Sequence, residues 1–417
     1  MDGEATSIQI ASAASGSLPS ASSSPRGGWG AVLALTLCVS TVIASEFMPV
    51  SILTPIAEDL RLSEGAAGQA IAISGLFAVI TSLGIATATR GIDRRALLLA
   101  LTTLMLLSGL MVAFAPNFLV FMTGRALLGV VIGGFWSMSA ATVMRLVPED
   151  QVPRALALLN GGNALATTIA APLGSFLGQY IGWRGAFFLV VPLAAITFAW
   201  QWLTLPPMPS DRNGGSASAL GVLRQPVARI GMAAMAALFA GQFALFTYLR
   251  PFLEGVTELS VSLLSLILLL MGLAGLAGTW LVGRLVARNL SAVLVIAPLV
   301  MAAIAVGLVA FGRFNVPTAI LLMLWGFAGT ALPVAWWTWL ARRLPKDAEA
   351  GGGLMVAVVQ LAITLGAAGG GLLFDTAGYQ ATFLTSAALL AASAMFAAFE
   401  ARRFAAATPE PTAPKES

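Results

Sequence analysis

The sequence predicts an all-α membrane protein in which twelve transmembrane helices form two parallel halves of six. Three observations support this class: the composition, the spacing of the apolar segments and an internal repeat. Of the 417 residues, 58% are hydrophobic and 10% are charged, whereas soluble globular chains carry about 25% charged residues. Most of the protein surface therefore cannot face water.

Apolar segments of membrane-spanning length recur along nearly the whole chain. A helix of about 20 residues crosses the ~30 Å hydrocarbon core of a bilayer. Barrel strands would alternate polar and apolar residues, and these segments do not. We predict helical spans at residues 29–56, 67–89, 96–114, 118–144, 154–181, 185–205, 226–251, 260–283, 291–311, 316–341, 350–374 and 380–401.

Three polar segments divide the chain. Residues 1–28, rich in serine and alanine, and the proline-containing residues 406–417 predict disordered tails. The N-terminus has acidic residues where a secretory signal would be basic. Residues 206–225 form the longest polar segment inside the chain. We therefore predict two six-helix bundles, at 29–205 and 226–405, joined by a linker.

The basic residues predict the orientation. With both termini on the inside, the inner loops and tails hold seventeen arginines and lysines, and the outer side holds four. Cytoplasmic loops of membrane proteins carry such an excess of positive charge. We therefore predict that both termini and the linker are cytoplasmic. The four outer residues are Arg61, Arg184, Arg250 and Arg313.

The two halves repeat at a fixed interval. Pro55 and Pro251 end the first and seventh spans and lie 196 residues apart, and Trp183 and Tyr379 open the sixth and twelfth spans at the same interval. The inner loops at 145–150 and 343–347 also match. Such a duplication predicts two halves in the same orientation, with a binding site between them near the middle of the membrane.

The residue types that are missing narrow the chemistry. The chain contains no histidine, which is the commonest metal ligand and the side chain that titrates near neutral pH. Its single cysteine, Cys38, lies among apolar neighbours and is predicted to pack. No segment resembles a phosphate-binding loop, and the basic residues lie in loops instead of on one nucleic-acid-binding face. We predict no enzyme, no cofactor, no metal and no nucleic-acid partner.

One charged side chain lies between Trp29 and Ile56, and it is Glu46. A carboxylate inside a membrane helix is unfavourable, so it usually faces an internal cavity and marks an ion or proton pathway. The alternative is an ion pair with a neighbouring helix that only holds the packing. Without histidine, any proton relay here depends on carboxylates.

Three segments carry glycine, proline and charged residues in defined patterns. The fourth span contains Gly124-Arg125 and then Gly129, Gly133 and Gly134. The fifth contains Ala171-Pro172, Gly174 and Gly178, and the loop between the second and third spans contains Asp93-Arg94-Arg95. These motifs resemble those of the major facilitator superfamily, in its group of drug and sugar exporters driven by proton antiport. That group usually has glycine where Ala171 stands and a further aspartate at the start of the loop motif.

Depth along the helices places Glu46 and Arg125 together in the outer half of the predicted bundle. Burial disfavours the charged carboxylate, and a nearby arginine favours it. Our hypothesis is that Glu46 carries the proton and Arg125 tunes it as the contact breaks and reforms between two conformations. The alternative is a permanent structural ion pair.

The glycines of these motifs have two possible roles. Small residues at these spacings let helix backbones approach closely, and Pro172 can kink its helix. Close approach is useful where helices must rock against each other, but it is also common in static packing.

Within the superfamily, the chain resembles the bacterial purine ribonucleoside exporters over essentially all twelve spans. The resemblance includes Glu46-Phe47-Met48-Pro49, residues 133–140, residues 241–248 and the stretch 336–339. It implies a monomeric inner-membrane exporter of purine nucleosides such as inosine, adenosine and guanosine, with protons as the coupled ion. Export of arabinose-type sugars or drugs is the nearest alternative, and a membrane receptor is a more distant one.

A purine nucleoside site needs aromatic rings for stacking and a few amides or hydroxyls for the polar edges. Amides are the better candidates because an unsatisfied amide in a span is unfavourable, although hydrogen bonds between helices would also satisfy them. Trp29, Trp183 and Trp339 are predicted to be interfacial anchors. The substrate-binding candidates at mid-depth are Phe135, Trp136, Ser137, Asn160, Asn163, Gln242, Phe243, Tyr248, Trp336, Trp337, Thr338 and Gln360.

Overall fold

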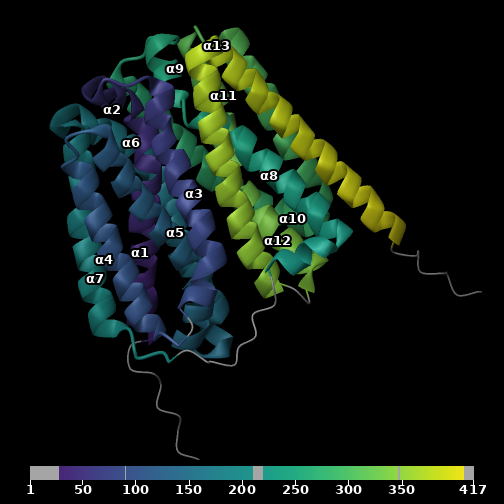
Figure 1. Ribbon diagram of the computed structural model, residues 1–417. Coiled ribbons are helices and arrows are strands. Elements are labelled where there is room, and N and C mark those ends of the chain that lie inside the picture. The colour runs from purple at the N-terminus through teal and green to yellow at the C-terminus, as the bar shows by residue number, and fades with distance from the viewer. Residues whose placement is uncertain (1–27, 90, 210–218, 346–347, 408–417) are drawn as a thin grey trace, which may run out of the picture.

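The computed structural model describes residues 28–89, 91–209, 219–345 and 348–407, and every regular element in those residues is a helix (Figure 1). The predicted tails, except residues 28, 406 and 407, which are helical, and the centre of the predicted linker lie outside the described residues. The helices are α1 (Gly28–Ser51), α2 (Leu53–Leu60), α3 (Glu64–Ala88), α4 (Arg94–Ala113), α5 (Phe118–Leu146), α6 (Val152–Phe188), α7 (Val190–Thr204), α8 (Pro226–Phe246), α9 (Leu249–Gly255), α10 (Val261–Phe311), α11 (Asn315–Gly329), α12 (Leu332–Arg343) and α13 (Ala348–Ala407), with short 3₁₀ helices at Glu149–Gln151 and Ala219–Arg224.

Nine helical stretches in the described residues are long and apolar enough to cross a membrane. Three of them run for 51 to 56 residues, far longer than one crossing needs. Each of the three contains one residue with non-helical backbone angles, at Gly182, Asn289 or Gly378, which divides it into two crossings. Counting these three twice gives the twelve predicted transmembrane helices.

Two of the dividing residues show the sequence repeat in their backbone conformation as well. Gly182 has φ +71° and Gly378 has φ +78°, in the left-handed region that glycine adopts without steric strain. They lie 196 residues apart, the same interval as the sequence matches. The corner between the sixth and fifth crossings is therefore built in the same way in both halves.

The first and seventh crossings are each broken near one end, where continuous spans were predicted. α1 ends at Ser51 and α2 begins at Leu53, and α8 and α9 are separated by Thr247 and Tyr248. Pro55 has no N–H to donate to the carbonyl four residues earlier, that of Ser51. The Arg250 guanidinium donates a hydrogen bond to that Ser51 carbonyl instead. Proline chemistry thus accounts for the break in the first crossing.

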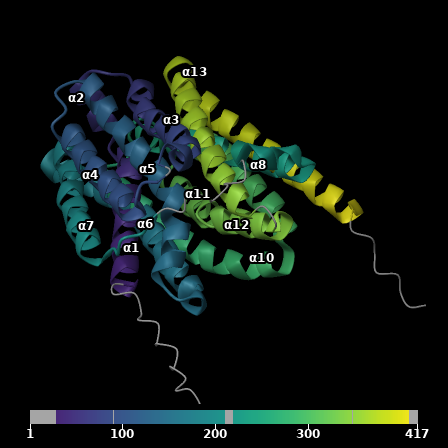
Figure 2. The same ribbon diagram turned by 60° about the horizontal axis from the view of Figure 1, so that its bottom comes forward.

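The two halves lie side by side and meet along two helix pairs. Figures 1 and 2 place α3 against α13, and Figure 2 also shows α6 next to α10. We call the end of the bundle that contains α2 and α9 the distal side, and the end that contains Gly28 and Arg403 the terminal side. Figure 1 shows the halves close together on the distal side and apart on the terminal side.

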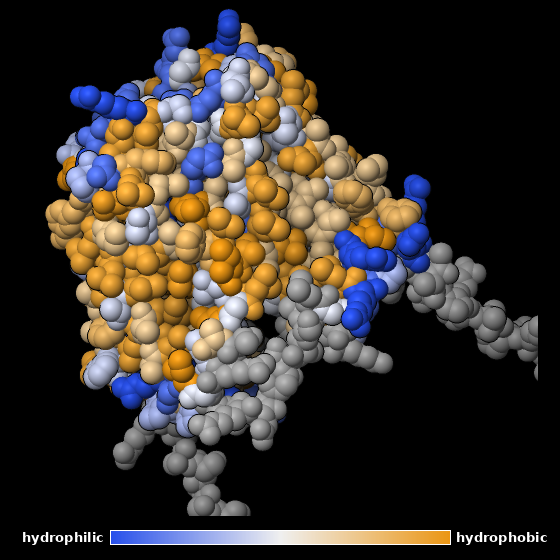
Figure 3. Space-filling view, in the orientation of Figure 1, coloured by the Kyte–Doolittle hydropathy of each residue, from blue (hydrophilic) through white to orange (hydrophobic). Residues whose placement is uncertain are grey.

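Large apolar side chains cover the outside of the bundle. Leu119 is 75% exposed and Leu203 is 81% exposed, far more than aqueous solvent favours. In Figure 3 apolar residues cover the middle of the visible face, and hydrophilic residues gather towards both ends. This distribution fits a surface that faces lipid over its middle and water at its ends.

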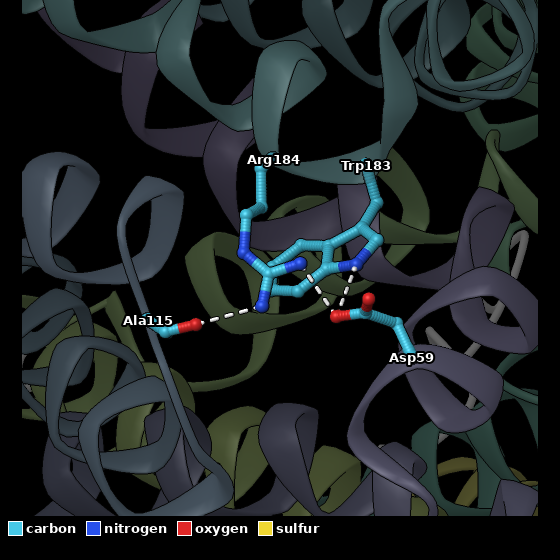
Figure 4. A network of polar contacts seen from close by, with 4 residues as sticks. All are labelled: Asp59, Ala115, Trp183 and Arg184. Carbon is cyan, nitrogen blue, oxygen red and sulfur yellow. Dashed lines mark hydrogen bonds and ion pairs between the residues drawn. The ribbon is translucent and has the colours of Figure 1, made fainter.

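A polar network ties the distal corner of the first half together (Figure 4). Asp59 accepts hydrogen bonds from the Trp183 indole at 3.3 Å and from Arg184 at 2.5 Å, and Arg184 also donates to the Ala115 carbonyl at 2.8 Å. The Trp183 ring is 4% exposed and packs edge-on against Phe121. The prediction of Trp183 as a lipid-facing anchor is therefore wrong, because its N–H finds a partner inside the protein.

Two other tryptophans were predicted to be interfacial anchors. Trp29 is 36% exposed and donates to Gln151 at the terminal side, as an anchor would be placed. Trp339 is 1% exposed and packs over Gly231, so the prediction for Trp339 is wrong. Gly231 has no side chain, and the indole ring occupies the space that this leaves.

Candidate functional site

Glu46 lies where the two halves meet. Its side chain is on α1, is 3% exposed and has apolar neighbours on its own helix. Its Oε1 atom accepts a hydrogen bond from Gln360 Nε2 of α13 at 3.4 Å. The carboxyl of the first half is thus in direct contact with an amide of the second half.

Arg125 is fully buried on α5 and lies beside Glu46, as the depth argument predicted. Its guanidinium nevertheless bonds to backbone. Nη1 donates to the Ser45 carbonyl at 2.7 Å, Nη2 to the Glu46 carbonyl at 3.2 Å and Nε to the Ala70 carbonyl at 3.1 Å. Among the described residues, no ion pair joins Arg125 to the Glu46 carboxylate, so the carboxyl is left available to Gln360.

The reason for this geometry lies in Pro49. In a regular helix the N–H of residue 49 would bond to the Ser45 carbonyl, but proline has no N–H. The Ser45 carbonyl is therefore left without its helical partner, and Arg125 supplies one. Sequence reasoning placed Arg125 correctly in depth and missed its backbone partners. The signal was present in the spacing of Ser45 and Pro49.

Two further contacts of α3 join it to the helices that carry Gln360 and Arg125. Thr364 of α13 donates to the Ala72 carbonyl of α3 at 3.3 Å, and a fourth interaction of Arg125 reaches Ser74 Oγ at 3.4 Å. Neither Ser74 nor Thr364 was among the predicted site residues. A single hydroxyl in a span carries little sequence signal, because most such hydroxyls bond to their own helix.

Aromatic rings from both halves meet next to this point. Phe47 of α1 stacks on Phe243 of α8, with ring centroids 5.7 Å apart, and Phe243 contacts Phe246 edge-on. The neighbouring Gln242 is half-buried, and its Oε1 atom has no hydrogen-bond partner among the described residues. Of the predicted substrate residues, Gln360 contacts Glu46 and Phe243 contacts its chain neighbour Phe47, while the Gln242 side chain with its free Oε1 atom lies beside Gly329 of α11. Phe47 was not predicted, although it lies in the same motif.

Other predicted substrate residues on the first half take part in packing. Phe135 is 1% exposed in the apolar core of that half, and Trp136 packs edge-on against it. Ser137 donates to the carbonyl of Gly133, and Asn160 to that of Leu156, each on its own helix. Asn163 is half-buried. A role for these residues in binding stays a prediction.

The remaining candidates lie on the second half. The Tyr248 hydroxyl donates to the Ala367 carbonyl at 2.7 Å, and its ring stacks on Phe374. Trp336 is 1% exposed against Trp339, and neither indole N–H has a partner among the described residues. Trp337 is 46% exposed and Thr338 donates to its own helix. Their role in binding also stays a prediction.

A latch of polar contacts holds the distal side closed. We use this name for Asp375 of α13 with Ser63 and Gly65 at the start of α3, and for Arg250 with Ser51. Asp375 accepts from Ser63 Oγ at 2.5 Å and from the Gly65 N–H at 2.9 Å. Seven hydrogen bonds join a described residue of one half to a described residue of the other, and they lie from Glu46 outward to this latch.

The loop motif of the second and third crossings holds the linker against the first half. Asp93 caps α4 by accepting from the Arg95 N–H at 2.7 Å, and it also accepts from the Met208 N–H. Arg95 donates to the Trp202 carbonyl and lies over the Trp202 ring. The Arg94 N–H donates to the Met208 carbonyl. The motif therefore contacts residues 202–208.

The motif glycines lie at close approaches between helices. A Cβ on Gly129 or Gly133 would collide with the backbone carbonyls of Ser74 or Ala78 on α3, and one on Gly134 would meet Leu101 and Ile85 side chains. A Cβ on Gly174 would meet Ser51 and Met48, and one on Gly178 would meet Ile52. Pro172 is buried inside α6. These glycines allow α5 and α6 to pack tightly against their neighbours.

Gly133→Ala is expected to destabilise the protein by about 1–3 kcal/mol, because the new methyl would meet a backbone carbonyl that cannot rotate away. Gly161→Ala is the matched control, since a Cβ there has nothing within 4 Å. Alanine is the better helix former by about 0.5–1 kcal/mol, so the control should be neutral or stabilising. Melting temperatures of the detergent-solubilised proteins measure both. Equal melting temperatures for the two variants would contradict this account of the glycines.

Comparisons with known proteins agree with this architecture. The family model described as Major Facilitator Superfamily matches residues 35–355. The "Transcription regulatory protein OpdE" of Pseudomonas aeruginosa is 54% identical over 90% of this chain and 94% of its own length. The "Purine ribonucleoside efflux pump NepI" of Salmonella paratyphi B is 39% identical over 90% of this chain and 95% of its own length.

Among solved structures, a bacterial homologue of the human lysosomal transporter Spinster, in an inward-facing and unoccupied conformation, superimposes with a TM-score of 0.73. The match covers 92% of this chain and 98% of that chain at 14% sequence identity, which shows the fold alone. Family model, relatives and fold lead to one assignment: the chain belongs to the major facilitator superfamily of membrane transporters.

Proposed function

We propose that the protein is a proton-coupled exporter of purine ribonucleosides, such as inosine, adenosine and guanosine, and of purine analogues. The observation that carries the proposal is the buried Glu46 carboxyl at the contact between the two halves. An ionisable group at that depth is expected to serve transport. The relatives named purine ribonucleoside efflux pumps support the choice of substrate.

We place the protein in the bacterial inner membrane with its terminal side towards the cytoplasm. The distribution of basic residues supports this orientation, since cytoplasmic loops carry the excess of positive charge. The latch then closes the outer side of the bundle, and the ends at which the two halves lie apart face the cytoplasm. The structure would accordingly represent the stage that opens inward.

Alternating access requires the two halves to rock against each other around a fixed site. Opening the outer side must break the contacts of Asp375 with Ser63 and Gly65, the Thr364 contact with α3 and the Gln360 contact with Glu46. Glu46 is the carboxyl group among these contacts that lies in the middle of a membrane-spanning helix. A proton gained or lost there changes the energy of the same movement that moves the substrate.

We infer that the nucleoside binds between the halves next to Phe47, Gln242 and Phe243. Aromatic rings supply stacking surfaces for a purine, and the free Gln242 carbonyl oxygen supplies a hydrogen-bond acceptor. Phe47 and Phe243 stack on each other in this structure. A purine would bind here by separating the two rings or by stacking on their outer faces. The bound partners in this account are one small molecule, protons and the bilayer.

A second candidate function follows from the relative named a transcription regulatory protein. A transporter that lowers the internal concentration of an inducer would alter transcription indirectly. This role needs a transported small molecule as well, but that molecule need not be a nucleoside. Export of arabinose-type sugars or of drugs is the alternative within the same class of transporter.

The deciding experiment uses the purified protein in liposomes loaded with labelled inosine. We expect an imposed pH gradient to drive inosine out of the liposomes and expect unlabelled adenosine or guanosine to compete. Protein-free liposomes and liposomes without a gradient are the controls. Movement of arabinose or a cationic dye without movement of inosine would overturn the nucleoside assignment. A rate of inosine movement that is the same with and without the pH gradient would overturn the proposal of proton coupling.

A further inference from the structure

Gln360 is the residue through which the second half contacts the proton-carrying carboxyl. Its side chain is 6% exposed, and its Nε2 atom donates to Glu46 Oε1 at 3.4 Å. Its other polar atom, Oε1, is buried and has no hydrogen-bond partner among the described residues. The amide is thus half satisfied in the outside-closed structure.

A buried acceptor without a partner is unfavourable. A charged carboxylate offers only acceptors and cannot satisfy the amide oxygen, whereas a protonated carboxyl offers one O–H donor. A neutral Glu46 can therefore donate its O–H to Gln360 Oε1 while accepting the N–H that it already receives. The two side chains would then form a pair of hydrogen bonds that satisfies both of them.

The other groups around the carboxyl are already engaged. Arg125 is the charged group that faces Glu46, and its N–H groups donate to the backbone of α1 and α3 and to Ser74. The Thr364 hydroxyl donates to the Gln360 and Ala72 carbonyls. Neither side chain donates a hydrogen bond to the Gln360 amide oxygen. The Glu46 proton is the donor that fits that position.

We propose that Gln360 is a positioning residue that makes closure of the outer side depend on the protonation of Glu46. The inference rests on the proposed proton-coupled export. A proton taken up from outside neutralises Glu46, and the pair with Gln360 forms as the halves close on that side. Release of the proton to the cytoplasm removes one of the two hydrogen bonds, so that the substrate-loaded protein opens outward more easily. Proton entry is thereby tied to substrate exit.

The test measures the closure directly and does not depend on the substrate. Spin labels are attached to cysteines replacing Leu119 at the start of α5 and Val316 at the start of α11, in a background with Cys38→Ala. Both side chains are well exposed at the distal ends of opposite halves, at 75% and 69%. Pulsed electron resonance then gives the short and long distance populations between the labels in lipid nanodiscs, from acidic to alkaline pH.

In the doubly labelled protein without further substitutions, we expect the short, outside-closed distance to dominate at acidic pH. The ratio of the short-distance to the long-distance population should fall about threefold to tenfold from acidic to alkaline pH, because that is the range expected for the loss of one net hydrogen bond. Gln360→Met should remove most of that pH dependence. Glu46→Gln should keep the acidic population ratio at every pH, because its amide N–H imitates the protonated acid. Adding Gln360→Met to Glu46→Gln should remove that effect.

Gln201→Met is the matched control. Gln201 is a fully buried amide that bonds to Thr102 within the first half, away from the contact between the halves. It should leave the pH dependence of the distances as it was. A Gln360→Met protein that still closes at acidic pH like the parent would overturn the proposal, and so would a parent without a pH-dependent distance. If the distances respond as expected while inosine does not move in liposomes, the substrate assignment fails and the coupling device stands.

Discussion

Replacing Glu46 by glutamine is expected to abolish inosine transport driven by a pH gradient. Glutamine has nearly the shape of glutamate but cannot release a proton, so the gradient has nothing to act on at the contact between the halves. Exchange of labelled for unlabelled inosine moves no net proton and should persist at a measurable rate. Gradient-driven flux and exchange flux in liposomes separate the two effects.

Glu58→Gln supplies the control for the Glu46 variant. Glu58 is an exposed glutamate on α2, on the distal side. Its replacement by glutamine is the same chemical change as in Glu46→Gln, made outside the buried site. It should transport with the parent's dependence on the gradient. The assignment of Glu46 as the proton carrier would be wrong if the Glu46→Gln protein followed the pH gradient as strongly as the Glu58→Gln protein does.

Arg125→Met is expected to cause a large loss of stability. Methionine fills a similar length but leaves the Ser45 carbonyl without any donor and removes the additional hydrogen bond that Arg125 gives to the carbonyls of Glu46 and Ala70. A buried group left unsatisfied costs about 1–3 kcal/mol and each further lost hydrogen bond about 0.5–1.5 kcal/mol, so we expect a total of about 2 kcal/mol or more. The Ser45 carbonyl has no helical donor to return to, because residue 49 is proline. The melting temperature and the yield of monodisperse protein measure the loss.

Two further variants separate charge from geometry at this position. Arg125→Lys keeps the charge but replaces the planar fork by a single ammonium group, so it should recover only part of the stability. Arg229→Met removes an exposed arginine from α8 and should leave the melting temperature nearly unchanged. An Arg125→Met protein as stable as Arg229→Met would mean that the bonds to the backbone contribute little.

Arg125 and Arg250 solve the same physical problem at two places. Pro49 and Pro55 each withhold an N–H from the carbonyl four residues earlier. Arg125 of the first half donates to the Ser45 carbonyl, and Arg250 of the second half donates to the Ser51 carbonyl. The first bond stays within one half and can be permanent, whereas the second crosses between the halves and must break when the outer side opens. Only the second therefore belongs to the moving latch.

The sequence alone determined the class of the protein and its duplicated plan. Membrane-spanning helices were predictable because the length and polarity of a span are local properties, set by the thickness of the bilayer. The interval of 196 residues between the halves was readable from short matches and reappears in the two corner glycines, Gly182 and Gly378. The depth of Glu46 and Arg125 followed from counting residues along their helices.

Only the tertiary structure decided which faces of the helices meet. Gln360 and Glu46 are 314 residues apart in sequence, and their contact depends on how α13 is rotated against α1. Trp183 and Trp339 are of the residue type that often anchors a helix at the membrane surface, but both are buried inside the protein, where Trp339 fills the space beside Gly231. Apolar residues surround most of these helices, so hydrophobicity does not select one face over another in a membrane. Close packing and the partners of a few buried polar atoms make that selection.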